Sequence, residues 1–139
     1  MTSDIEELTP DTCWELLSTE SVGRLAVSIA NQPDIFPINF VVDRESVVFR
    51  TAEGTKFAAA LLGRGVAFEA DAEADGVAWS VVVKGQAREI EEMYELFAAE
   101  DLPLYPWHSA PKHHFVRIVP TEVTGRRFQV VDWGQLPAL

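Results

Sequence analysis

The chain contains 139 residues, 47% of them hydrophobic and 24% charged, which are the proportions of one globular domain. Its net charge of -11 argues against nucleic acid and anionic lipid as partners, because both would be repelled. The single cysteine, Cys13, excludes an intrachain disulfide and a zinc site built from cysteines. No apolar run approaches the ~20 residues of a membrane span and the N-terminus is acidic, so we expect a cytoplasmic protein. We expect a single domain over residues 1–139, with an acidic lead-in at 1–8 and a C-terminal tail at 129–139.

The first predicted element is a helix in "TPDTCWELLSTE". Thr9 is placed to act as its N-cap, and Pro10 suits the first helical position, where a missing N–H costs nothing. Cys13 and Trp14 fall on the apolar stripe of this helix. We therefore interpret both as core residues, Cys13 as a small buried hydrophobe and Trp14 as a packing residue rather than a cofactor-stacking one.

Three strands are predicted to follow this helix. The first is Val22–Ala30, and a turn over Asn31–Asp34 leads into the second, Ile35–Asp43. The third is the apolar run "VVFRT", Val47–Thr51. A short helix, Lys56–Arg64, is expected next, because a run of helix-forming residues ends near a glycine suited to a C-cap.

The second half of the chain also predicts a mainly β structure. Apolar and polar positions alternate in Gly65–Ala72, and the longest strand candidate is Val77–Ile90. A helix is predicted over Glu91–Glu100. Its apolar stripe consists of Met93, Leu96 and Phe97.

A long irregular segment, "DLPLYPWHSAPKHH", precedes two last strands in "FVRIVP" and "EVTGRRFQV". Irregular segments of this length in compact domains are usually functional or interfacial. Near-consecutive strands, short connections and few helices together predict a β-barrel or closed sheet with small helical additions.

The stretch "FRTAEGTK", Phe49–Lys56, joins the third strand to the short helix and admits three interpretations. It is not a P-loop, because that motif needs an upstream glycine and Gly-Lys-Ser/Thr at its end. A purely structural interpretation assigns Gly54 to a turn, Thr55 to the helix N-cap and Lys56 to the solvent.

The third interpretation, which we favour, is an anion site. A helix that begins near Thr55 offers free backbone N–H groups and a partial positive charge. Lys56 adds a full charge, and Arg50 can direct two donors toward phosphate oxygens. Thr51 and Thr55 add hydroxyl groups. The segment is therefore suited to holding a phosphate group.

Six segments, taken in order along the chain, carry a resemblance to a known family. They are "CWELL…VGRLAV" (Cys13–Val27), "PINFVVD" (Pro37–Asp43), "FRTAEGTK", "VAFEAD" (Val66–Asp71), "WSVVVKGQA" (Trp79–Ala87) and "VPTEVTGRRF" (Val119–Phe128). The ordered set resembles the pyridoxamine 5′-phosphate oxidase-like, flavin-binding split-barrel proteins, and most of all the small, actinobacterial-type members. No single segment is highly specific, but the set spans most of the chain.

The resemblance implies a mainly β fold, namely a six-stranded split β-barrel (FMN-binding split barrel) with a few short peripheral helices. It also implies a homodimer that binds flavin mononucleotide (FMN) in a groove at the subunit interface. The cofactor-binding residues that it implies are Pro37, Ile38, Asn39 and Phe40 along the isoalloxazine ring, Arg50, Thr51, Thr55 and Lys56 at the phosphate, Trp79, Ser80 and Val81 beside the ring, and Trp107 across the dimer.

The activity that the resemblance implies is that of a flavin-dependent oxidoreductase, which acts on a small-molecule substrate or electron donor at the ring's N5. No Ser/His/Asp or paired-carboxylate arrangement is recognisable, so we assign no catalytic residue. The vitamin oxidase's C-terminal arginine and histidine have no counterpart after Phe128, which leaves the substrate unassigned.

Three alternatives stay open. The deazaflavin coenzyme F-420 has a longer acidic tail, for which Lys112 and Arg117 are candidate cations. A flavin-binding module without turnover would serve as a sensor or carrier. A haem-binding relative is the least favoured alternative. Its candidate histidines are His108, His113 and His114. No other ligands accompany them at metal-binding spacing, so we expect no metal site.

The remaining cations are interpreted from strand alternation. Arg126 and Arg127 fall on opposite faces of the last strand, so at most one faces a given groove. We expect one of the two to form a structural or dimer ion pair. Lys84 and Arg88 share a face of the long strand, which we expect to face solvent rather than ligand.

Overall fold

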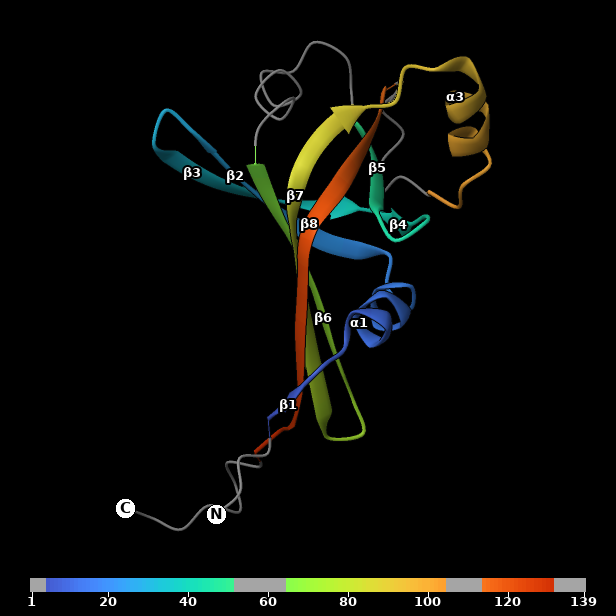
Figure 1. The fold of residues 1–139 in the computed structure, drawn as a ribbon. Coiled ribbons are helices and arrows are strands. Elements are labelled where there is room, and N and C mark those ends of the chain that lie inside the picture. Colours follow the sequence, from blue (N-terminus) through green and yellow to red (C-terminus); the bar gives the residue numbers. More distant parts are fainter. Residues whose placement is uncertain (1–4, 52–64, 105–113, 132–139) are drawn as a thin grey trace.

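The computed structural model describes residues 5–51, 65–104 and 114–131. Within these residues the strands form one antiparallel sheet in the order β3-β2-β6-β7-β8-β5-β4, with β1 paired to β8 (Figure 1). The strands are β1 (Glu6–Glu7), β2 (Val22–Ile29), β3 (Gln32–Asn39), β4 (Val41–Val42), β5 (Val47–Thr51), β6 (Gly65–Ala74), β7 (Val77–Glu89) and β8 (His114–Gln129). The helices are α1 (Pro10–Leu17) and α3 (Met93–Glu100).

The sheet has the form expected of a split barrel. Its six longer strands are β2, β3, β5, β6, β7 and β8, whereas β1 and β4 have only 2 residues each. The edge strand β3 contacts β5, although the two are far apart in the strand order, because the sheet curls (Figure 1). The predicted fold class, a mainly β six-stranded split barrel with short peripheral helices, is confirmed.

Helix α1 begins as the sequence predicted. The Thr9 hydroxyl accepts a hydrogen bond from the Thr12 N–H at 3.3 Å, and Pro10 occupies the first turn. Cys13 and Trp14 are buried, as expected. Burial raises the pKa of the Cys13 thiol, so this side chain stays a neutral packing group.

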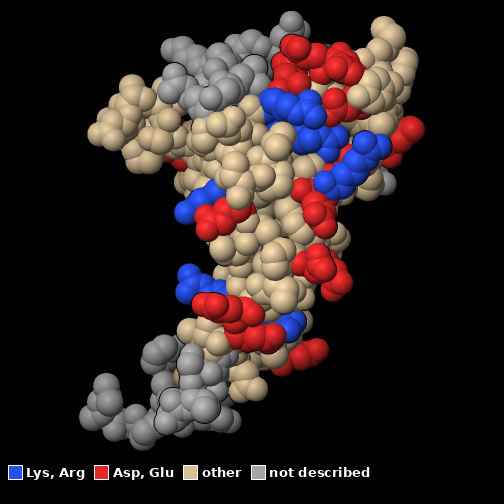
Figure 2. All heavy atoms as spheres, viewed as in Figure 1, with Lys and Arg blue, Asp and Glu red and all other residues tan. Residues whose placement is uncertain are grey.

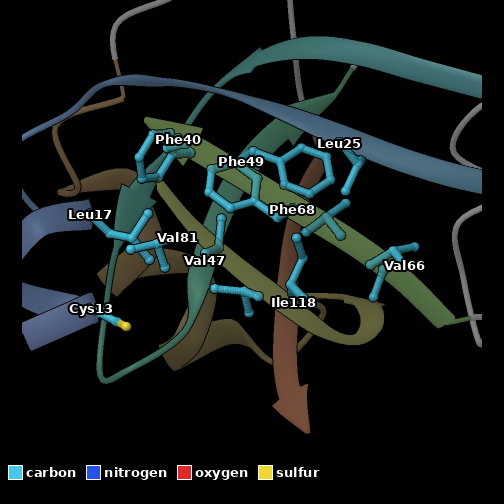
Figure 3. Packing of buried hydrophobic residues seen from close by; sticks show 14 of the residues in the cluster. Cys13, Leu17, Leu25, Phe40, Val47, Phe49, Val66, Phe68, Val81 and Ile118 are labelled. Carbon is cyan, nitrogen blue, oxygen red and sulfur yellow. The ribbon is translucent and has the colours of Figure 1, made fainter. Parts of the chain in front are cut away.

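The main core lies between α1 and the inner face of the curled sheet (Figure 3). Alternation in β6 buries Val66, Phe68 and Ala70, as predicted. The Phe68 ring lies edge-on to the ring of Phe40, with 4.7 Å between centroids. This core fixes the end of β3 against β6, and therefore determines where the chain leaves β3.

The first predicted turn is wrong in position. The chain reverses at Ala30 and Asn31, whose φ angles of 50° and 63° are those of a two-residue hairpin turn. Gln32 already pairs with Ile29, so β3 starts before the predicted end of the turn. Proline at position 33 is tolerated because β3 is an edge strand.

The predicted strand Ile35–Asp43 is interrupted at Phe40. The N–H of Phe40 donates to the carbonyl of Ser21 at 3.0 Å instead of joining a ladder. After this break, β4 pairs with β5 rather than with β2. The chain therefore passes from one edge of the sheet to the other at this residue.

The two predicted last strands form one continuous strand, β8. Opposite it, Lys84 of β7 pairs with Glu122 and Gly85 pairs with Pro120, so Thr121 is an extra residue in the ladder. The Thr121 hydroxyl donates to the Lys84 carbonyl at 3.2 Å. A β-bulge lets a strand bend without ending, which explains why the chain continues past Pro120.

Helix α3 starts at Met93, two residues later than predicted, and of its predicted apolar stripe only Leu96 is packed, whereas Met93 and Phe97 are wrong. Met93 and Phe97 are 72% and 63% exposed, whereas Leu96 and Ala99 pack against the sheet. The buried side of α3 is determined by a second core cluster, which consists of Val48, Ile90, Ala99, Leu104 and Phe115. The prediction of a helix over Lys56–Arg64 falls outside the described residues.

Candidate functional site

The end of β5 carries the part of the predicted phosphate site that the structure describes. Arg50 is half-buried, and its guanidinium lies 4.8 Å from the centroid of the Phe115 ring, a cation–π arrangement that holds it in place. Thr51 is only 5% exposed. The two residues are adjacent in a strand, so their side chains point to opposite faces of the sheet. Arg50 shares its face with Val48 and the second core cluster.

The predicted ring-contacting segment, Pro37–Phe40, lies close to this corner. Its first three residues form the end of β3, where Pro37 pairs with Arg24 of β2, and Phe40 follows directly after the strand. Strands β3 and β5 contact each other, and the chain crosses to β4 immediately afterwards. Pro37 is exposed, whereas Phe40 is buried in the core. The structure thus brings this segment and Arg50 to one end of the barrel.

The third predicted group, Trp79–Val81, lies at the other end of the sheet (Figure 1). Trp79 and Val81 point into the core, and Ser80 points to the opposite, outer face. Phe115, the register partner of Arg50, accepts a hydrogen bond from Ile90 at 2.9 Å. Ser80 and Ile90 are ten positions apart along β7 and its continuation, roughly 33 Å of extended chain. Within one subunit, Ser80 and Arg50 are therefore not brought together.

Ser80 lines a hollow on the outer face of β7 and β8, with a volume of about 390 Å³. Its lining is partly apolar and includes one acidic and one basic side chain, Glu7 and Arg126. The full lining is Ile5, Glu7, Leu8, Ser80, Val82, Val123, Thr124, Gly125 and Arg126. Cross-strand register places Asp71, Ser80, Arg126 and Glu7 in one row across four strands.

Several predicted residues fall outside the described part of the chain. They are Thr55, Lys56, Trp107, His108, Lys112 and His113. His114 is described, and its Nδ1 lies 3.3 Å from a carboxylate oxygen of Glu89. Among the described residues, no cluster of His, Cys, Asp and Glu has the arrangement of a metal site. Neither of the two helices in this part of the chain has the length and hydrophobicity of a membrane-spanning helix.

Arg117, a candidate cation for a deazaflavin tail, is instead part of a buried ion-pair network. Its guanidinium lies 3.0 Å from Asp43 and 3.2 Å from Glu95, and it donates to the Ser46 hydroxyl at 2.6 Å. Hydrogen bonding from Arg88, opposed by burial and aided by Arg117, lowers the pKa of Glu95. Arg117 is therefore engaged in joining α3, β8 and the β4–β5 turn, and is not available to a ligand.

The structure also tests the expectations for two other cations, Arg127 and Lys84, that were interpreted from strand alternation. Arg127 pairs with Glu6 at 3.1 Å, which confirms a structural ion pair for one of the two late arginines. Lys84 is exposed and lies 3.9 Å from Glu122, which confirms that it faces solvent. In Figure 2, the Lys and Arg side chains on the visible face lie beside Asp and Glu side chains.

One charged group was missed by sequence reasoning. Arg24 of β2 bridges two carboxylates of β6, with Nε 2.7 Å from Glu69 and Nη2 3.2 Å from Asp71. Burial and the neighbouring Asp71 raise the pKa of Glu69, while Arg24 opposes the shift. The sequence did contain a signal for the two carboxylates, because residues two positions apart in a strand, such as Glu69 and Asp71, lie on one face. It contained none for the pairing of β6 with β2, which brings Arg24 to them.

A curled antiparallel sheet with short helices at its flank defines a split-barrel protein. Residues 9–127 match the family model of pyridoxamine 5′-phosphate oxidase, and the chain belongs to that family. The structure is similar to that of the FAD binding protein from Mycobacterium smegmatis, with 42% identity and a TM-score of 0.80 over 88% of this chain and 98% of that one.

Two further relatives have the same 42% identity, over different shares of the chain. A conserved protein of unknown function from Corynebacterium diphtheriae is 42% identical, with a TM-score of 0.77 over 91% of this chain and 99% of that one. An uncharacterised protein of Mycobacterium tuberculosis is 42% identical over 89 residues, which are 64% of this chain and 81% of the relative.

Proposed function

We propose that this chain is a flavin-binding protein, and a cytoplasmic flavin-dependent oxidoreductase whose substrate is a small molecule. The observation that carries the proposal is the 42% identity, over nearly the whole of both chains, to a protein that binds FAD. FMN is the common part of both flavin nucleotides, so the proposed corner at Arg50 would hold the FMN phosphate whether or not adenosine monophosphate is attached to it.

The donor set at the corner fits a phosphate. Arg50 supplies a planar fork of donors, and stacking on Phe115 limits the conformations that it must lose on binding. Lys56 would add a point charge. Because Arg50 and Thr51 face opposite sides of β5, we assign the phosphate contact on β5 to the Arg50 side chain.

We also propose that the cofactor site is shared by two subunits. Ser80 and its neighbours are expected beside the ring, yet roughly 33 Å of strand separates Ser80 from the level of Arg50. One FMN molecule is too short to reach both places in one subunit. A homodimer in which each subunit supplies the Arg50 corner to one site and the Ser80 face to the other removes this conflict.

When bound, a flavin supplies the hydride and electron chemistry, and the protein's residues position it. Arg50 would anchor the phosphate end, and the backbone of Pro37–Phe40 would lie along the ring. Phe40 is rigidly packed in the core, so the segment before it is held in a fixed position.

The proposal is tested by purifying the protein and identifying the small molecule that comes with it, by absorption spectrum and mass. The expected result is a yellow protein that carries FMN or FAD. A deazaflavin, which absorbs further to the blue, would replace the flavin in the proposal, and a Soret band would show haem. Tight flavin binding with NAD(P)H oxidation no faster than that of free flavin would identify a carrier or sensor.

We predict that Arg50→Ala and Lys56→Ala each weaken FMN binding by about 1–3 kcal/mol, because each removes a charge-assisted contact to phosphate. Riboflavin has no phosphate, so its affinity should change little. Fluorescence titration of both ligands measures the difference, and Arg44→Ala, an exposed arginine on the β4–β5 turn, is the matched control. Equal losses for FMN and riboflavin would show that the phosphate lies elsewhere.

A further inference from the structure

Two adjacent residue pairs of β1 and β8 behave differently. Glu6 and Arg127 are register partners and form an ion pair at 3.1 Å. Glu7 and Arg126 are also register partners, on the opposite face, and both line the hollow around Ser80. Among the described residues, no carboxylate oxygen lies within 4.0 Å of the Arg126 guanidinium nitrogens.

Carboxylates outnumber cations in this chain, whose net charge is -11. Of the six other arginines that the structure describes, five contact a carboxylate or an aromatic ring, and only the exposed Arg44 does not; the five are Arg24, Arg50, Arg88, Arg117 and Arg127. Arg126 and its register partner Glu7 instead both line the hollow without forming an ion pair with each other. The hydroxyl groups of Ser80 and Thr124 and the apolar side chain of Val82 complete its surroundings.

An arginine and a carboxylate that line the same hollow without pairing with each other complement a flat group that has carbonyl oxygens flanking an N–H. Arginine donates to carbonyl oxygens, and a carboxylate accepts from the N–H. The pyrimidine edge of a flavin is such an imide, and the valine side chain offers an apolar surface for the ring behind it.

We infer that Arg126 and Glu7 of one subunit bind the imide edge of the flavin whose phosphate is held at Arg50 of the second subunit. This inference rests on the proposed function, and it assigns a flavin-recognition role to Arg126, which the sequence left open, and to Glu7, which the sequence did not single out. Arg126 would also tune the flavin's reduction potential, because a reduced flavin carries more negative charge at this edge than an oxidised one.

The test compares Arg126→Gln with Arg44→Gln, a matched arginine that is exposed and lies at the β4–β5 turn, far from the hollow. Arg126→Gln should weaken FMN binding about tenfold and make the midpoint potential of bound flavin more negative. Arg44→Gln should change neither. Thermal melting of both variants checks that each remains folded.

A second measurement tests Glu7 with FMN methylated at N3, which has lost the imide hydrogen. The wild-type protein should bind this ligand about tenfold more weakly than FMN, and Glu7→Ala should remove most of that preference. The inference is wrong if Arg126→Gln binds FMN as tightly as the wild-type protein does and the bound flavin has the same midpoint potential in both. It is also wrong if the wild-type protein binds FMN and N3-methylated FMN with equal affinity. Failure of wild-type protein to bind any flavin would instead overturn the proposed function itself.

Discussion

Arg117→Ala is expected to lower the free energy of unfolding by about 3 kcal/mol, because it leaves partly buried carboxylates without their cation. The Arg117 side chain is 10% exposed, and those of its partners Glu95 and Asp43 are 16% and 26% exposed. It also donates to the buried Ser46 hydroxyl. The variant would therefore lose the contacts that tie α3 and the β4–β5 turn to β8.

The matched control is Arg127→Ala, which removes an ion pair of similar length whose side chains are 36% and 59% exposed. Exposed pairs contribute about 0–1 kcal/mol, so urea denaturation should show a much smaller loss for this variant. Equal losses for the two variants would mean that burial does not determine the contribution of the Arg117 network.

The same network gives the Arg117 prediction a pH dependence. The pKa of Glu95 is lowered in the folded state, chiefly by its hydrogen bond from Arg88 and also by Arg117. Its ionised form therefore stabilises the fold fully above the unfolded-state pKa, and this contribution is lost as the pH falls through the lower folded-state pKa. The stability difference between wild-type protein and Arg117→Ala should accordingly shrink in acid.

Gly85→Ala is expected to lower the free energy of unfolding by about 3 kcal/mol, because the bulge leaves no room for a side chain. A Cβ atom at this position would lie 2.1 Å from the carbonyl oxygen of Val119 and 2.8 Å from its carbonyl carbon. Both are backbone atoms, so the strands themselves would have to separate.

Gly65→Ala is the control for this prediction, since no heavy atom of the residues that the structure describes lies within 4 Å of a Cβ built there. This variant should be as stable as the wild-type protein or slightly more so, because alanine restricts the unfolded chain. The comparison is made by urea denaturation. A stable Gly85→Ala protein would show that β7 and β8 are not locked in register at the bulge.

Much of the fold was predictable because its signals are local. The Thr9 cap, the alternation around Phe68 and the strand ending at Thr51 depend only on neighbouring residues. The errors occur where tertiary packing decides. The ladder beside Thr121 absorbs an extra residue, and the second core cluster selects Leu96 rather than Phe97 as the buried side of α3.

The candidate site was predictable only in part for the same reason. Arg50 could be selected from the sequence around it, but the network of Arg117 joins residues from β4–β5, α3 and β8 that no local pattern links. Alternation correctly separated Arg126 from Arg127, and yet which of them had a partner depended on the pairing of β1 with β8.

The central claim is that one flavin is held by two subunits, at Arg50 of one and at the Ser80 face of the other. The most direct measurement mixes two variants, Arg50→Ala and Ser80→Phe, the second chosen to fill the hollow. Each alone should bind FMN weakly at both sites of its dimer. After subunit exchange, mixed dimers would contain one intact site, so about one site in four should regain wild-type affinity. If mixed dimers form and no tight site returns, the site is not shared in this way and the account is wrong.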